Sequence, residues 1–196
     1  MTNETSITDR YDVLVVGFGP AGAVAAGYVM LDTVADADHA ATLRFAGQGV
    51  DRLTDIYDKP RAIAIDHEIL RHFDNMGVAD QVMPYVAPFT ASQHFGAKGQ
   101  LIRRIDMVPE PYPLGYTPSM VFTQPPVEAV LRDHAESFGC VTVSLGVEMV
   151  DLDIREGEVI ATLKDASGET RQVAARYLIE PCSRACRHHA GGSGVR

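Results

Sequence analysis

Three glycines near the N-terminus have the spacing that phosphate binding requires. Residues 17–22 read GFGPAG and match the pattern G-x-G-x-x-G. Gly17 permits a tight turn, Gly19 lets the backbone approach a pyrophosphate, and Gly22 lets a helix pack closely on a strand. A helix that begins at this turn presents N–H groups and the positive end of its dipole to phosphates. The residues therefore predict a dinucleotide site of the FAD or NAD type.

The elements on either side of the glycines support this prediction. Residues 11–16 (YDVLVV) form a compact apolar run, as expected of a buried parallel strand, and residues 21–29 continue as a helix of small residues. A strand, a glycine turn and a helix in this order favour a nucleotide-binding βαβ unit over a purely structural turn. Pro20 within the turn is more typical of flavoproteins than of nicotinamide dehydrogenases.

The motif also requires an acidic residue about 20 positions further on, whose carboxylate would bind the ribose hydroxyls of the nucleotide. Asp36 and Asp38 lie near that spacing, but no strand-like run precedes them. Asp51 and Arg52 end a short strand-like run and are the better local match, although Asp51 lies 34 positions after Gly17. The alternative for each aspartate is a solvated charge in a loop.

The second strand expected of such a unit is not evident in the sequence. Residues 31–50 are rich in alanine and aspartate with weak apolar periodicity, and we predict no element there. Clearer helical patterns follow. Asp66 is placed to cap a helix that Gly77 ends. The proline pair at 125–126 opens a second helix, which stops at Gly139.

The last third of the chain has the alternating pattern of strands. The runs 141–150, 158–163 and 171–179 are separated by glycine-containing turns and predict a β-meander. Residues 84–123 are rich in proline, glycine and aromatic residues, which indicates loops and irregular strands. The predicted fold class is α/β, a Rossmann-like βαβ unit with a parallel sheet, a β-meander and an incomplete substrate-side layer.

The composition limits the partners and the location of the protein. The 196 residues carry a net charge of −9, which argues against nucleic acid because phosphate backbones are bound by basic surfaces. No apolar run approaches the length of a membrane span, and the 3 cysteines are too few for a disulfide framework. The polar N-terminal residues lack the apolar core expected of a signal peptide. We expect a cytoplasmic protein that binds small molecules.

Longer runs of the sequence resemble a known family. Residues 57–68 (YDKPRAIAIDHE), 93–96 (QHFG) and 122–128 (FTQPPVE), together with the glycine turn, are similar to the class A flavoprotein aromatic hydroxylases. The resemblance covers residues 11–29 and about 50–179. It implies FAD as cofactor, NADH as co-substrate, and hydroxylation of small phenolic acids of the 3-(3-hydroxyphenyl)propionate type.

The resemblance also implies particular cofactor contacts. The glycine turn would hold the FAD pyrophosphate and Asp51 its ribose, while Arg61 and Gln124 would make further flavin contacts. The alternatives are a surface salt bridge for Arg61 and a polar helix start for Gln124. No catalytic residue is assigned. The predicted cofactor-binding residues are Gly17, Phe18, Gly19, Pro20, Ala21, Gly22, Asp51, Arg52, Arg61 and Gln124.

Two segments depart from the family pattern. Residues 28–49 stand where the second strand is expected, and residues 180–196 replace an Asp-Gly motif; a later Gly-Asp motif would lie beyond Arg196. Four side chains in the final segment are of types that can bind metals, but they lack the spacing of a zinc module, and no metal is predicted: Cys182, Cys186, His188 and His189.

The predicted organisation is a disordered tail (1–10), an FAD-binding unit (11–83, including 28–49), a partial substrate-side region (84–123), a helix with the β-meander (124–179) and a disordered tail (180–196).

Three functions are compatible with these residues. The first is the N-terminal part of an FAD-dependent aromatic hydroxylase, and the second is a non-catalytic remnant that binds a nucleotide weakly. The third is another FAD-dependent oxidoreductase. The departures favour the remnant for this chain taken by itself, whereas the runs 93–95 and 122–128 argue against a different flavin enzyme.

Overall fold

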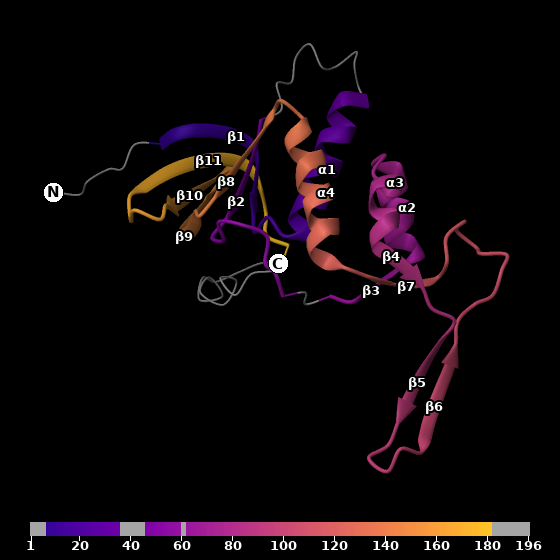
Figure 1. The fold of residues 1–196 in the computed structure, drawn as a ribbon. Helices are drawn as coiled ribbons and strands as arrows, with labels where there is room; N and C mark the ends of the chain where they lie inside the picture. Colours follow the sequence, from indigo (N-terminus) through magenta and orange to yellow (C-terminus); the bar gives the residue numbers. More distant parts are fainter. Residues whose placement is uncertain (1–6, 36–45, 60–61, 182–196) are drawn as a thin grey trace. The chain divides into compact units, whose positions relative to one another are not determined.

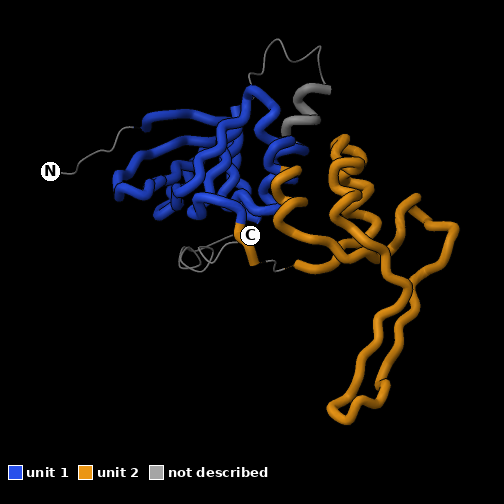
Figure 2. Tube along the Cα trace, in the orientation of Figure 1, with its two compact units in different colours: residues 1–56, 132–196 blue, residues 57–131 orange. Residues whose placement is uncertain are grey.

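The computed structural model describes residues 7–35, 46–59 and 62–181. The chain divides into two compact units, unit 1 (residues 1–56 and 132–196) and unit 2 (residues 57–131), which are coloured separately in Figure 2. Seven residues considered in the sequence analysis lie outside the described ranges: Asp36, Asp38, Arg61, Cys182, Cys186, His188 and His189. Within the described ranges, no helix has the length and apolar character needed to cross a lipid bilayer.

Unit 1 is built on a six-stranded sheet with the order β8-β2-β1-β11-β10-β9 (Figure 1). The strands are β1 (Ile7–Val16), β2 (Gly47–Asp51), β8 (Val141–Leu145), β9 (Glu148–Arg155), β10 (Glu158–Lys164) and β11 (Thr170–Ile179). β1 runs parallel to β2 and β11, and β2 runs parallel to β8. β9, β10 and β11 pair antiparallel. The predicted α/β fold with a parallel sheet and a meander is confirmed.

β1 is the buried parallel strand that its apolar run predicts. Val13, Leu14, Val15 and Val16 are each at most 8% exposed, because both faces of the strand are covered. Leu14 and Val16 belong to a core that also includes residues of β2, β9, β10 and β11. Helix α1 (Pro20–Ala35) packs close to β1, near Val15.

β1 begins earlier than the sequence analysis places it. Residues 7–10 are strand rather than tail, and Ile7 already pairs with β11. Three of these four residues are polar, so they give no apolar signal. Arg10 bonds Glu158 at 2.6 Å and Asp9 bonds Arg171 at 3.2 Å, so ion pairs accompany the backbone pairing in this part of the strand.

The second strand of the nucleotide-binding unit is β2. The expectation that residues 31–50 hold no element is wrong at both ends, because α1 continues to Ala35 and β2 begins at Gly47. The sequence of β2 lacks the apolar pattern of a strand, in part because packing leaves no room for a side chain at position 49. A Cβ on Gly49 would lie 2.5 Å from the ring of Phe18, which is fully buried.

We expect Gly49→Ala to lower the free energy of unfolding by about 1–3 kcal/mol, because the added methyl group must displace the Phe18 ring. Urea unfolding of the two single variants and of the double variant Gly49→Ala/Phe18→Leu measures the effect. The smaller leucine makes room for the methyl group, so the double variant should be more stable than the sum of the single effects predicts, by about 0.5 kcal/mol or more. Strict additivity is the result that contradicts this packing.

The predicted run 141–150 is two strands rather than one. β8 ends at Leu145, and Gly146 adopts a φ of +69°, a conformation that favours glycine. β8 therefore lies on the outer side of β2, and the meander consists only of β9, β10 and β11. The turn donates backbone hydrogen bonds from Gly146 to the Leu53 carbonyl (3.0 Å) and from Val147 to the Asp51 carbonyl (2.9 Å). These bonds anchor the turn beside the end of β2.

Unit 2 contains a three-stranded sheet of order β3-β7-β4 and a separate ribbon of β5 and β6, which extends away from the rest of the unit (Figure 1). Its strands are β3 (Ala64–Asp66), β4 (Val86–Pro88), β5 (Ala91–Phe95), β6 (Leu101–Asp106) and β7 (Ser119–Phe122). Its helical segments are α2 (His67–Asn75), α3 (Ala79–Val82), η1 (Met83–Tyr85) and the first part of α4 (Gln124–Ser137), which continues into unit 1.

Both predicted helices are present. The side chain of Asp66 accepts a hydrogen bond from the Ile69 N–H at 3.0 Å and so caps α2, while Leu70 and Phe73 are buried. The apolar positions predicted for α4 are Val127, Val130, Leu131, Ala135 and Phe138, of which Val127, Leu131 and Ala135 are buried and the other two half-buried. In α2 the predicted face also included Ile69, which is 40% exposed and so does not belong to the buried face.

Candidate cofactor site

The glycine turn connects β1 to α1 in unit 1. The first helical hydrogen bond runs from the Ala23 N–H to the Gly19 carbonyl at 2.9 Å, and Pro20 occupies the first position of α1, where a missing N–H is tolerated. By helix geometry, the N–H groups of Ala21 and Gly22 have no carbonyl partner one turn earlier. These donors and the helix dipole make this end of α1 suited to an anion.

The glycines of the turn have different steric roles. Gly17 adopts a φ of +95°, which L side chains rarely adopt. A Cβ on Gly22 would collide with the carbonyl oxygen of Gly17 and lie 3.4 Å from Cγ1 of Val15, so glycine allows α1 to approach β1. A Cβ on Gly19 would meet no atom within 4 Å. The turn is therefore open at Gly19, where a phosphate could approach the backbone.

Asp51 lies against this turn, although 33 positions separate it from Phe18 along the chain. Its carboxylate accepts hydrogen bonds from the N–H groups of Phe18 (2.8 Å) and Leu53 (2.9 Å). The Gly17 N–H donates to the Val50 carbonyl at 2.8 Å, so the end of β2 holds the turn through two bonds. A carboxylate has about four acceptor positions, which leaves Asp51 capacity to bind ribose hydroxyls.

Arg52 follows Asp51 directly and has an exposed side chain. A hollow of about 220 Å³ is lined by Arg52, Thr54, Gly146, Glu148, Lys164, Asp165 and Ala166. The Asp51 carbonyl accepts a hydrogen bond from the N–H of Val147, which follows the lining residue Gly146, so the hollow lies beside Asp51. Because both positively and negatively charged side chains line it, the hollow has no electrostatic preference for an anion over a neutral group.

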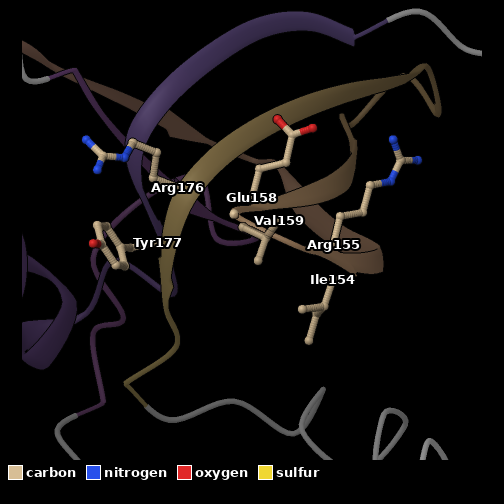
Figure 3. A pocket seen from close by; sticks show the side chains of 7 residues that line it. Ile154, Arg155, Glu158, Val159, Arg176 and Tyr177 are labelled. Atoms are coloured by element: carbon tan, nitrogen blue, oxygen red, sulfur yellow. The ribbon is translucent and has the colours of Figure 1, made fainter.

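A larger hollow lies where β9 turns into β10, beside β11 (Figure 3). Its volume is about 360 Å³, and none of the predicted site residues lines it. Three of its charged side chains, Arg155, Glu158 and Arg176, each have an oppositely charged partner at 2.6 to 3.7 Å. Because these charges are compensated within the protein, we do not assign the hollow to the cofactor.

Gln124 is the first residue of α4, lies in unit 2 and is 4% exposed. Its Oε1 accepts a hydrogen bond from the Ala62 N–H at 3.0 Å, and its Nε2 donates to Glu128 at 3.3 Å. Gln124 is therefore more than a polar helix start, because it binds the residue that follows Arg61. Glu128 was not predicted as a site residue, although its spacing of four residues from Gln124 places both side chains on one helix face.

Comparison with known proteins identifies the family. Residues 10–181 match a family model described as an FAD binding domain. This chain belongs to that family. The 3-(3-hydroxy-phenyl)propionate/3-hydroxycinnamic acid hydroxylases of Comamonas testosteroni and Escherichia coli K12 are similar in sequence to this FAD-binding domain, with 34% and 27% identity over 174 and 179 residues. The matches cover 87% and 90% of this chain, but only 27% and 29% of the two relatives.

Solved structures share the fold of this FAD-binding domain. The flavin-dependent monooxygenase PieE, in complex with FAD and substrate, matches with a TM-score of 0.70 at 22% identity, over 88% of this chain and 30% of PieE. The p-nitrophenol 4-monooxygenase PnpA of Pseudomonas putida DLL-E4 matches with a TM-score of 0.71 at 17% identity, over 88% of this chain and 41% of PnpA. The family match and the two sequence relatives confirm the resemblance to flavoprotein aromatic hydroxylases, and the solved structures show that the fold is shared.

The residues of the glycine turn and β2 fit the adenosine diphosphate part of FAD. The turn offers backbone N–H donors and an open surface at Gly19, as a pyrophosphate requires. Asp51 offers the carboxylate that a ribose requires, at the end of the neighbouring strand. Among the described residues, no three or more His, Cys, Asp or Glu side chains are grouped so that they could hold a metal ion.

Proposed function

We propose that this chain is the FAD-binding part of a cytoplasmic, NADH-using hydroxylase that acts on small phenolic acids of the 3-(3-hydroxyphenyl)propionate type. The observation that carries the proposal is the contact between the glycine turn and Asp51 at the carboxyl ends of β1 and β2, where α/β sheets bind nucleotides. The names of the relatives support the substrate class. Because the chain spans less than a third of their length, we assign it FAD binding and assign hydroxylation to the whole protein.

The residues of the site have separate tasks in this proposal. The N–H groups of Ala21 and Gly22 bind the pyrophosphate, and the open surface at Gly19 lets it approach. Asp51 accepts hydrogen bonds from the ribose and at the same time fixes the turn through Phe18. Bound FAD supplies the electron transfer and oxygen activation that side chains lack. The protein binds and orients the cofactor.

Flavin retention tests the proposed cofactor. The purified chain is mixed with FAD, separated from free cofactor by gel filtration, and its visible spectrum is recorded. A flavin absorption band near one equivalent per chain is the expected result, and a colourless protein contradicts the proposal.

NADH oxidation by the whole protein, followed with and without 3-(3-hydroxyphenyl)propionate, then separates the functions. NADH loss that depends on the phenol supports the hydroxylase. Loss that ignores the phenol points to another FAD-dependent oxidoreductase. FAD binding without any NADH loss by the whole protein points to a non-catalytic protein that only binds the nucleotide.

The substitution Asp51→Asn tests the ribose contact. Asparagine keeps one acceptor oxygen but turns an NH₂ group toward one of the two N–H donors, and it loses the charge that strengthens a bond to the ribose. We expect FAD affinity to fall by about 10- to 100-fold, since hydrogen bonds to charged groups contribute about 1.5–3 kcal/mol. Fluorescence titration of FAD measures the change.

Asp55→Asn is the matched control for this substitution. Asp55 is exposed, and its carboxylate bonds the N–H of the neighbouring Ile56. We expect it to leave FAD affinity unchanged. Equal affinities for the Asp51 and Asp55 variants would remove Asp51 from the site.

A further inference from the structure

The ribbon of β5 and β6 in unit 2 carries several large apolar side chains that are exposed. The ribbon extends away from the rest of the unit (Figure 1), and Phe95, Leu101 and Ile102 are 60%, 52% and 68% exposed. Val108, just beyond the end of β6, is 53% exposed. A two-stranded ribbon is at best marginally stable in water by itself. These side chains therefore indicate a surface that another chain covers.

The outer edge of β6 is free to pair with a further strand. Among the described residues, β5 and β6 pair only with each other. The Met107 N–H donates to the Thr90 carbonyl at 2.9 Å, on the inner side of the ribbon. Because the backbone groups of an antiparallel strand alternate in direction, those of Arg104 and Asp106 face the outer side. Such an edge is a template for strand pairing.

The residues around Ile105 are complementary to their own reverse order. Arg104 and Asp106 flank Ile105 directly and have opposite charges, while the apolar Ile102 and Val108 lie three positions away on either side. In an antiparallel pair of two copies with Ile105 opposite Ile105, Arg104 lies opposite Asp106 of the second copy. In the same register, Ile102 lies opposite Val108. Charged side chains at a sheet edge usually prevent pairing, but here each charge faces the opposite charge.

The charged side chains of this edge are available to a second copy. Arg104 Nε lies 2.7 Å from Asp106 Oδ1 in the same chain, and the two side chains are 52% and 67% exposed. An exposed pair of this kind contributes little stability by itself. In the paired register, each carboxylate also faces the guanidinium group of the second copy, and each Arg104–Asp106 pair exchanges backbone hydrogen bonds in both directions.

We propose that the outer edge of β6 is an interface between two copies of this chain, which pair antiparallel about Ile105. The interface is isologous, because a two-fold axis places the same residues on both sides. It joins two marginal ribbons into a single four-stranded sheet. Because the contact surface is small, we expect monomers and dimers in equilibrium, with a Kd in the micromolar range. The inference concerns association of the chain and does not depend on FAD binding.

Sedimentation velocity of the full chain, over a series of protein concentrations, measures the dimer. Arg104→Asp places carboxylates opposite carboxylates, and Asp106→Arg places guanidinium groups opposite guanidinium groups. The two-fold axis applies each substitution twice, so we expect the Kd of the dimer to rise by at least about tenfold for either variant. Circular dichroism establishes that each variant is folded.

Arg155→Asp is the matched control. Arg155 belongs to β9 in unit 1 and has the same kind of exposed ion pair, in which its Nε lies 2.8 Å from Asp153 Oδ2, two residues away. The substitution changes the net charge of the chain as much as Arg104→Asp does. We expect the Kd of the natural dimer, because β9 lies outside the proposed interface.

Two further samples test the register. The double variant Arg104→Asp/Asp106→Arg exchanges the charges and keeps the net charge, so its Kd should return to within about threefold of the natural value. An equimolar mixture of the two single variants should form a heterodimer, because one edge then carries only carboxylates and the other only guanidinium groups. The mixture needs neither variant to pair with itself.

Three results would overturn the proposal. The first is a natural chain that stays monomeric over the whole concentration series. The second is a dimer that neither single variant weakens, because such a dimer uses another surface. The third is a weakened dimer that neither the double variant nor the mixture restores, because residues 104 and 106 of the two copies then do not face each other. None of these results bears on FAD binding, so the proposed function is tested separately.

Discussion

Replacing Gly19 with aspartate should abolish FAD binding and leave the fold intact. A Cβ at this position meets no atom within 4 Å, so the side chain can be accommodated. Gly19 precedes the first residue of α1, where aspartate is a favourable helix cap. The new carboxylate, however, lies where the pyrophosphate has to approach. Placing like charges together costs several kcal/mol, so we expect affinity to fall by more than about 100-fold.

The matched control is Gly19→Asn, which has nearly the same size and capping ability but no charge. FAD titration by flavin fluorescence compares the three proteins, and urea unfolding reports their stability. We expect both variants to be as stable as the natural chain, and the asparagine variant to bind FAD far more tightly than the aspartate variant. If the aspartate variant binds FAD like the natural chain, the pyrophosphate does not lie at this turn.

Gly22→Ala should have the largest effect on stability. The added Cβ would collide with the carbonyl oxygen of Gly17 and lie 3.1 Å from its carbonyl carbon, and both are backbone atoms. A flexible side chain could move aside, but here α1 has to separate from β1 or the turn has to change shape. We expect the free energy of unfolding to fall by about 3 kcal/mol, the upper end of the usual range for over-packing. Urea unfolding of the apoprotein measures this.

Gly139→Ala is the control for this substitution, because a Cβ there meets no atom within 4 Å and the backbone has no left-handed φ. We expect its stability to stay within about 0.5 kcal/mol of the natural chain. Similar losses for the two variants would mean that the close approach of α1 to the turn is not what Gly22 provides.

The parts of the fold that follow from local pattern were predictable from the sequence. The apolar run of β1, the glycine turn and the start of α1 are adjacent in the chain, and each has its own signal. The same holds for α2, whose capping residue Asp66 and apolar face are a few positions apart. In these segments the residues that determine the structure are neighbours in the sequence.

The parts that depend on distant contacts were not predictable. β2 was not predicted because the need for glycine at position 49 comes from packing against Phe18, which lies 31 positions earlier in the chain. The division of 141–150 into two strands depends on pairing between β8 and β2. Glu128 reads as an ordinary helix residue until its burial and its bond to Gln124 are known. In each case tertiary packing decides the role of a residue whose local pattern is neutral.

The hydrogen bond from the Phe18 N–H to the Asp51 carboxylate joins the two parts of the site, the glycine turn and the end of β2, whatever the length of chain between them. The entropy of closing a loop grows only with the logarithm of its length, so a doubling costs about 0.6 kcal/mol. Insertions between α1 and β2 can therefore accumulate at little thermodynamic cost, provided that β2 still docks on β1. Searches that count positions from the glycine turn will overlook such sites. Searches for an acidic residue at the end of the adjacent parallel strand will find them.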